Sequence, residues 1–412
     1  MAQTLFIVIL VIVVVNYLFG LLLDLLDSTR WSNILPSELS GIYDAEKYAK
    51  SQDYEKANMR FSLISGGFSF LLLMLMICLG GFAWLDNVVR SVTAHPVLIS
   101  LLFFGALGLA SDLLTTPFSA YHTFVIEQKF GFNTTTVTTF ILDKLKSWLM
   151  AAVLGGGILS FIVWIYGVTG SWFWIIAWMA MTFFSVFMSL FYSNIIVPLF
   201  NKQTLLAPGT LRDAIEKFAV RAGFKLKNIY IINGSKRSKK ANAYFTGFGP
   251  KKRIVLYDTL LGDFTDDEIV AILAHEIGHY KKKHVLFGLV SGIISSGVLF
   301  YILSLVIGSP EMAGALGAGQ ASFHMGILAF GLLYSPVSLV LGIAGNYFSR
   351  RHEFAADGYA VAHADANAFA QGLKKLYVMS LSNLRPHPFT VLITYSHPPL
   401  LQRLAAIEKK QC

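Results

Sequence analysis

Long apolar segments dominate this 412-residue chain and restrict it to folds that a lipid bilayer can accommodate. Hydrophobic residues make up 55% of the sequence and charged residues only 14%, whereas soluble domains carry about 25% charged residues. An apolar run of about 20 residues is long enough for a helix to cross the hydrocarbon core. Seven such segments lie at 4–26, 61–85, 97–114, 147–168, 172–196, 285–307 and 325–345. We therefore expect an α-helical integral membrane protein with seven transmembrane helices.

Basic residues fall almost entirely on one side of these segments. The connections at 27–60, 115–146 and 197–284 and the tail after 345 share that side, and they hold every Lys and Arg except Arg90. Because basic loops stay in the cytoplasm, we expect an outward N-terminus and a cytoplasmic tail. The net charge of +9 then reflects these loops and anionic headgroups. We expect membrane lipid as a partner and no nucleic acid.

The alternation of apolar and polar stretches predicts four parts. Five membrane helices precede a cytoplasmic α+β segment, two further membrane helices and a cytoplasmic tail, with boundaries at 1–200, 201–284, 285–345 and 346–412. Apolar periodicity predicts a helix from Thr210 and two tail helices, at 364–380 and 398–409. Runs between turn residues predict short strands, at 228–233, 243–247 and 253–257.

The segment His275-Glu-Ile-Gly-His279 carries the clearest chemical signal. Histidines four positions apart project from one face of a helix, and two imidazoles placed in this way are half of a tetrahedral zinc site. Glu276 lies beside them, where it can accept a proton from water. Thr265 and Glu268 form a capping box, which predicts that a helix starts just before the motif.

A catalytic zinc ion usually has three protein ligands and one open position, so a third ligand must come from elsewhere. The seventh apolar segment returns to the same membrane face and is followed at once by Glu353. Topology therefore places this carboxylate near His275 and His279. Asp357 follows one helical turn later, where it can accept the free ring N–H of a ligand histidine.

Six motifs occur in order along nearly the whole chain. Three of them are Asn242-Ala-Tyr244, Arg350-Arg-His-Glu-Phe-Ala-Ala-Asp357 and Ser396-His-Pro-Pro-Leu-Leu-Gln-Arg403; the others are 117–133, 198–202 and 275–279. Together they resemble the type I CAAX prenyl proteases, which are integral membrane zinc metallopeptidases. The resemblance implies seven helices that enclose an intramembrane chamber beneath a small cytoplasmic catalytic domain. It also implies one zinc ion per chain, bound by His275, His279 and Glu353, with Glu276 as the base.

The resemblance extends to residues that would contact the substrate. His397 is placed to donate to an oxyanion, although a histidine before two prolines also braces turns. Arg403 can bind a substrate carboxylate bidentately or pair with a nearby acid. Asn242, Ala243 and Tyr244 correspond to an edge strand along which an extended peptide pairs, or to a plain structural strand.

These features predict a CAAX-prenyl-protease-like zinc metalloendopeptidase at the cytoplasmic membrane face. It would remove C-terminal residues from peptides, including prenylated ones, or cleave membrane-associated proteins. The short chain and the short connection at 308–324 favour a prokaryotic member in a bacterial inner membrane, with the endoplasmic reticulum as the location in a eukaryote. Three alternatives stay open: a heat-shock-type membrane quality-control protease, an ion or solute transporter, and a structural zinc site with His397 as a fourth ligand.

Overall fold

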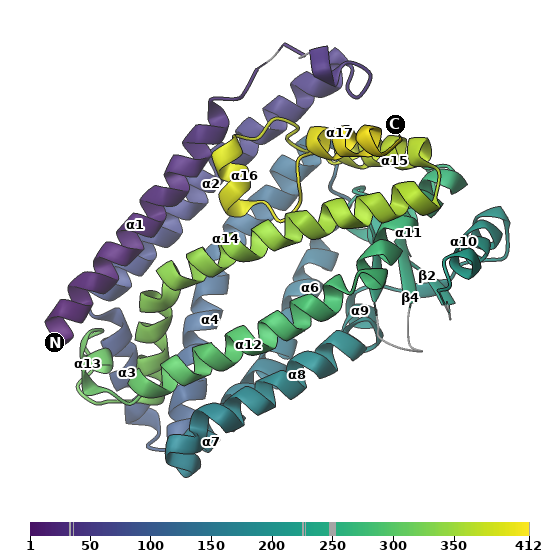
Figure 1. The fold of residues 1–412 in the computed structure, drawn as a ribbon. Helices are drawn as coiled ribbons and strands as arrows, with labels where there is room; N and C mark the ends of the chain where they lie inside the picture. The colour runs from purple at the N-terminus through teal and green to yellow at the C-terminus, as the bar shows by residue number, and fades with distance from the viewer. Residues whose placement is uncertain (33, 36, 225, 227, 247–252, 412) are drawn as a thin grey trace.

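The computed structural model describes the chain except residues 33, 36, 225, 227, 247–252 and 412 (Figure 1). Its membrane part contains α1 (Ala2–Ser28), α2 (Ala45–Cys78), α3 (Gly81–Val92), α4 (Pro96–Tyr121), α5 (Gln128–Phe130), α6 (Val137–Met150), α7 (Gly156–Thr169), α8 (Phe173–Ile195), α9 (Val197–Phe200), α12 (His284–Val306), α13 (Pro310–Gly314) and α14 (Phe323–His363). Six helical segments among the described residues are long and apolar enough to cross a membrane. The predicted helical membrane architecture is therefore confirmed, while the count of seven stays a prediction.

The difference in count arises in one segment, Val137–Phe200, which runs for 64 residues. It contains both α7 and α8, which contact each other. Between them, Gly170 adopts a φ of 55°, a conformation that glycine reaches without the steric cost other residues incur. The predicted segments 147–168 and 172–196 lie on either side of this residue.

Helix α14 continues without a break for 41 residues, past the predicted boundary at residue 345. It contains Pro336, which lacks the N–H that would otherwise bond to the carbonyl of Leu332. The Ser335 hydroxyl donates to that carbonyl instead, at 3.0 Å. Asn16 of α1 donates to the same hydroxyl at 2.7 Å. The membrane part and the site beyond it thus share one continuous element.

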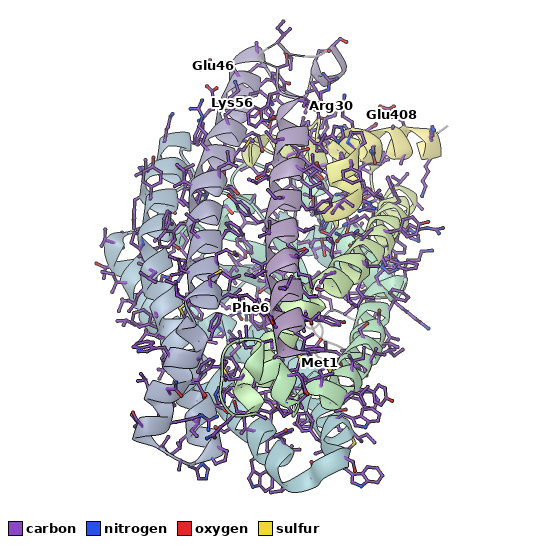
Figure 2. The ribbon with its side chains drawn as sticks, turned by 90° about the vertical axis from the view of Figure 1, so that its left-hand side faces the viewer. Met1, Phe6, Arg30, Glu46, Lys56 and Glu408 are labelled. Carbon is purple, nitrogen blue, oxygen red and sulfur yellow. The ribbon has the colours of Figure 1, made fainter. Side chains whose placement is uncertain are left out.

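Buried side chains gather at the two ends of the membrane helices. One apolar cluster contains Ile9, Phe103 and Met325, at the end where Met1 and Phe6 lie, whereas Arg30, Glu46, Lys56 and Glu408 lie at the other end (Figure 2). Between these ends, no described residue is buried over 14–22, 55–76, 104–125, 178–192, 284–296 and 331–352. A solid bundle would bury an apolar stripe along each helix. At this depth the described helices therefore do not form a solid bundle.

The remaining elements form an α+β unit at the end that carries Glu408. Its sheet has the order β1-β2-β4-β3, in which β2 and β4 are parallel and the outer pairs are antiparallel. The strands are β1 (Gln203–Leu205), β2 (Asn228–Ile232), β3 (Ala243–Thr246) and β4 (Arg253–Tyr257), and the helices are α10 (Thr210–Arg221), α11 (Asp266–Lys281), α15 (Ala366–Met379), α16 (Pro388–Thr394) and α17 (Leu400–Gln411).

The predicted strands and helices of this unit are confirmed, apart from residue 247, which lies outside the described residues. Strand β1 and helix α16 were not predicted. One buried cluster joins Leu256 of β4, Ile269 of α11, Phe369 of α15 and Leu400 of α17. The segment before α12 and the segment after α14 therefore share one core, which fixes α11 against the end of α14.

The capping box at the start of α11 is present. The Thr265 hydroxyl accepts from the Glu268 N–H at 3.3 Å, and the Glu268 carboxylate accepts from the Thr265 N–H at 2.9 Å. Thr265→Ala is expected to lower the free energy of unfolding by about 1 kcal/mol, measured by chemical denaturation in detergent. Thr265→Ser is the control, because it keeps the acceptor; equal stability of the two variants would contradict the expectation.

Candidate metal centre

Helices α11 and α14 contact each other (Figure 1) and bring together two distant stretches of sequence. Gly278 lies at this contact: a Cβ atom there would stand 3.1 Å from the carbonyl oxygen of Ala356. Only glycine permits so close an approach of the two backbones without displacement. Packing thereby explains the glycine at the second variable position of the HEXXH motif, and His275 and His279 face Glu353.

The three predicted ligands form one cluster, in which the candidate ligand atoms all lie within 4.8 Å of one another. His275 Nε2 lies 3.5 Å from Glu353 Oε2, and His279 Nε2 lies 3.2 Å from Glu353 Oε1. The two Nε2 atoms are 3.1 Å apart. His275 and Glu353 are buried and His279 is half-buried.

The chemistry of this cluster fits a zinc ion. Glu353 Oε2 is buried and has no hydrogen-bond partner, which is costly for a carboxylate oxygen in a protein interior. Two imidazole nitrogens and one carboxylate oxygen are a donor set found in catalytic zinc sites. A zinc ion bound by all three residues would remove the cost of the unpaired oxygen.

Asp357 supports His275 from the side opposite the cluster. His275 Nδ1 donates to Asp357 Oδ1 at 2.8 Å, and Arg403 donates to both oxygens of Asp357, from Nη2 at 2.6 Å and from Nε at 2.9 Å. Burial lowers the pKa of His275, but the neighbouring carboxylates of Asp357 and Glu353 outweigh that effect and raise the pKa to about 9. A metal ion must therefore compete with a proton for this imidazole.

Of the two alternatives for Arg403, the structure shows pairing with a nearby acid. Its side chain is buried, and its remaining Nη1 atom lies 3.6 Å from Glu353 Oε2. The guanidinium is thus already occupied by carboxylates of the protein itself. Binding of a substrate carboxylate by Arg403 stays a prediction.

Glu276 faces the same cavity as the cluster but is not part of it. Burial raises the pKa of Glu276, and the neighbouring His275 and His279 oppose that shift without cancelling it. A carboxylate with a raised pKa is a stronger proton acceptor. The position and the environment of Glu276 both suit a general base.

His397 lies at the rim of the cluster, just before α17. Its Nε2 atom is 3.4 Å from Glu353 Oε1, while 61% of its side chain is exposed. Its Nδ1 atom lies 3.0 Å from the hydroxyl of Ser396. The large exposed fraction suits a group that meets a substrate better than it suits a fourth ligand of a closed structural site.

Two histidines near the cluster were missed by the sequence analysis. His284 Nδ1 lies 3.1 Å from His279 Nδ1, and the rings of His284 and His352 are stacked with centroids 4.0 Å apart. The available signal was proximity in sequence, because His284 follows the HEXXH motif closely and His352 directly precedes Glu353.

Asn242, Ala243 and Tyr244 lie at the edge of the sheet. Ala243 and Tyr244 belong to β3, which pairs with β4 and contacts α11. Asn242 comes directly before β3, and its carbonyl accepts from the Tyr257 N–H at 3.0 Å. None of the three is among the described residues that line the cavity beside the cluster. Their role in binding a substrate stays a prediction.

A cavity of about 720 Å³ begins at the cluster and continues between α12 and α14. Its polar part is lined by His275, Glu276, His279, Glu353 and His397. Further in, the lining is mostly apolar, with Val285 and Phe287 from α12 and with Leu341 and Phe348 from α14, and it also includes Ser291 and Ser295 of α12. A candidate reaction centre is thus continuous with an apolar pocket.

The multi-pass helical fold and the His/Glu cluster together define an integral membrane metallopeptidase. Residues 26–202 match the family described as CAAX prenyl protease N-terminal, five membrane helices, and residues 206–411 match peptidase family M48. The chain belongs to peptidase family M48 and is of the CAAX prenyl protease type.

Individual relatives agree with this assignment. The CAAX prenyl protease 1 homolog of Arabidopsis thaliana is 34% identical, over 96% of this chain and 95% of its own length. CAAX prenyl protease 1 of Saccharomyces cerevisiae is also 34% identical, over 91% of this chain and 88% of its own, and the Homo sapiens homolog is 31% identical over the same shares. The crystal structure of S. mikatae Ste24p superposes with a TM-score of 0.92 at 30% identity, over 98% of this chain and 99% of that one.

The predicted family and the predicted class of enzyme are therefore confirmed. The expectation of a prokaryotic member has no support, because the relatives named above come from a plant, yeasts and a human. That expectation relied on chain length and on one short connection. Loop length is a weak guide to origin, since surface loops gain and lose residues at little energetic cost.

Proposed function

We propose that this chain is a zinc-dependent endopeptidase that removes C-terminal residues from prenylated peptides at the cytoplasmic face of a membrane. One observation carries the proposal: His275, His279 and Glu353 converge beside Glu276 at the polar end of a cavity whose lining is mostly apolar between α12 and α14. The names of the relatives support the substrate class. One zinc ion per chain would be held by the three clustered residues.

The protein's own side chains would carry the proton and stabilise charge. Bound zinc supplies Lewis-acid chemistry, which brings the pKa of water near to neutral. Glu276 would accept a proton from the water whose oxygen attacks the substrate carbonyl, and would return that proton to the amine that leaves when the C–N bond breaks. The Ser396 hydroxyl donates to His397 Nδ1, so that the Nε2–H of His397 is available to the oxyanion that develops on the substrate carbonyl. Asp357 and Arg403 hold His275 in place.

The shape of the cavity supports a substrate with a peptide part and an apolar part. An extended peptide would pair along β3, while an isoprenoid chain would lie against the apolar side chains of Val285, Phe287 and Leu341. The helices around this depth bury no side chain among the described residues of 284–296 and 331–352. That absence of packing supports the chamber that the family resemblance implies.

The eukaryotic relatives favour the endoplasmic reticulum as the membrane of this enzyme. The distribution of Lys and Arg in the sequence favours a cytoplasmic catalytic unit.

Zinc content and cleavage-site mapping test the proposal together. The purified protein in detergent is expected to hold one zinc ion and to cut a farnesylated peptide near its C-terminus, more efficiently than the same peptide without the farnesyl group. A transporter would not hydrolyse either peptide. A quality-control protease would cleave unfolded proteins whether or not they carry a farnesyl group. Absence of zinc-dependent cleavage would refute the proposal.

His397→Ala is expected to lower kcat by about 10²- to 10³-fold, because one donor to the oxyanion is lost. Zinc content should stay at the wild-type level, since His397 lies outside the ligand cluster. Ser396→Ala is the matched variant and should have a smaller effect, because it removes only the orienting hydrogen bond. Loss of zinc from His397→Ala would instead identify His397 as a ligand.

A further inference from the structure

The two histidines of the cluster are held by different partners at Nδ1. Both present Nε2 to Glu353, which leaves Nδ1 directed away from the cluster. The partner of His275 is the carboxylate of Asp357, at 2.8 Å. The partner of His279 is Nδ1 of His284, at 3.1 Å. Groups that hold the outer nitrogen of a metal-binding histidine fix its orientation and its tautomer.

We propose that His284 is a positioning residue, which accepts the Nδ1–H of His279 and thereby directs His279 Nε2 toward the metal. This inference rests on the proposed zinc site. When Nε2 of a neutral imidazole binds a metal, its proton is on Nδ1. His284 Nδ1 must then be the acceptor, and His284 must carry its own proton on Nε2. His275 is thus supported by the carboxylate of Asp357, and His279 by the neutral imidazole of His284.

The backbone and the neighbouring rings fix His284 in this position. Lys283, between α11 and α12, adopts a φ of 61°, which is uncommon for a residue other than glycine. This turn starts α12 at His284, beside His279. The ring of His284 stacks on His352 with an interplanar angle of 9°, and His352 meets Phe287 edge to face. A stacked ring keeps its plane, so the Nδ1 lone pair stays directed at His279.

Two substitutions at His284 distinguish the effect of its hydrogen-bond acceptor from the effect of its aromatic ring. His284→Phe keeps an aromatic ring for stacking on His352 but has no acceptor at the δ position. His284→Asn keeps a δ oxygen that can accept from His279 but loses the ring. The zinc dissociation constant is measured by competition with a chelator in detergent. His284→Phe is expected to weaken zinc binding by about 10- to 100-fold, whereas His284→Asn should remain close to wild type.

Activity gives a second readout, because saturating zinc should restore most of the turnover of His284→Phe. His363→Phe is the control: His363 is exposed, stacks on Tyr359 and should leave zinc affinity unchanged. If His284→Phe does not fold, as judged from the melting of the metal-free protein, His284→Leu removes the same acceptor and replaces it in the comparison with His284→Asn.

The outcomes separate this inference from the proposed function. A wild-type protein without zinc would refute the proposed function itself. If wild type binds zinc, unchanged affinity in the variant that lacks the acceptor overturns the role of His284. Equal weakening in that variant and in His284→Asn also overturns it, because the ring and not the acceptor would then matter.

Discussion

Glu276→Gln is expected to lower the rate of peptide cleavage by about 10²- to 10⁴-fold while one zinc ion stays bound. Glutamine has nearly the shape of glutamate but cannot accept a proton from water, so the chemical step loses its base. Zinc should remain, because Glu276 is outside the cluster of His275, His279 and Glu353. Single-turnover cleavage of a farnesylated peptide and metal analysis of the same sample measure both effects.

Asp267→Asn provides the matched control for this variant. Asp267 is an exposed acid in the first turn of the same helix, so its neutralisation changes the charge of α11 without touching the cavity. Its turnover should equal that of wild type. If Glu276→Gln keeps wild-type turnover, Glu276 is not the base and the proposed mechanism fails.

Arg403→Met is expected to lower the free energy of unfolding by about 3–5 kcal/mol. Arg403 and Asp357 are 5% and 2% exposed, so removal of the guanidinium leaves the buried carboxylate of Asp357 without the two hydrogen bonds that Arg403 donates. Chemical denaturation of the metal-free protein in detergent measures the loss. Arg403→Lys should lose less, because it keeps the charge but not the bidentate geometry.

A surface pair gives the control for this effect. Arg212 pairs with Glu216 at 2.8 Å while both side chains are partly exposed, and Arg212→Met is expected to cost less than about 1 kcal/mol. Adding Asp357→Asn to Arg403→Met should recover part of the lost stability, because no unpaired charge is then buried. An Arg403→Met variant no less stable than Arg212→Met would show that the buried pair contributes little.

The features predictable from sequence are those that a local pattern specifies. The capping box at Thr265 determines where α11 begins, and the spacing of His275 and His279 determines that they share a face. The position of Glu353 also followed from sequence, because consecutive antiparallel membrane helices return the chain to the same face. Strand β1 could not be predicted, since Gln203–Leu205 is too short to show an alternating pattern.

Other features depend on backbone hydrogen bonding and tertiary packing, which local sequence patterns do not predict. Hydropathy falls after Gly345, but a helix ends where its hydrogen bonding ends, and α14 continues to His363. The contact between His284 and His279 depends on the positive φ of Lys283. A lysine in a sequence does not predict this backbone conformation, because residues other than glycine rarely adopt it. The hydrogen bonds between Arg403 and Asp357 depend on how α17 packs on α14. These features depend on tertiary packing, in the core that the segment before α12 shares with the segment after α14.

The continuity of α14 connects the membrane-spanning part of the protein directly to the ligand cluster. About 30 residues separate the start of this helix from Glu353, which is a length of about 45 Å at 1.5 Å per residue. Helices adjust their tilt to match the hydrocarbon thickness around them, so the thickness of the bilayer acts on the same helix that carries Glu353. Because one shared core holds α11 against the end of α14, a change of tilt would move His275, His279 and Glu353 together and leave the distances within the cluster unchanged.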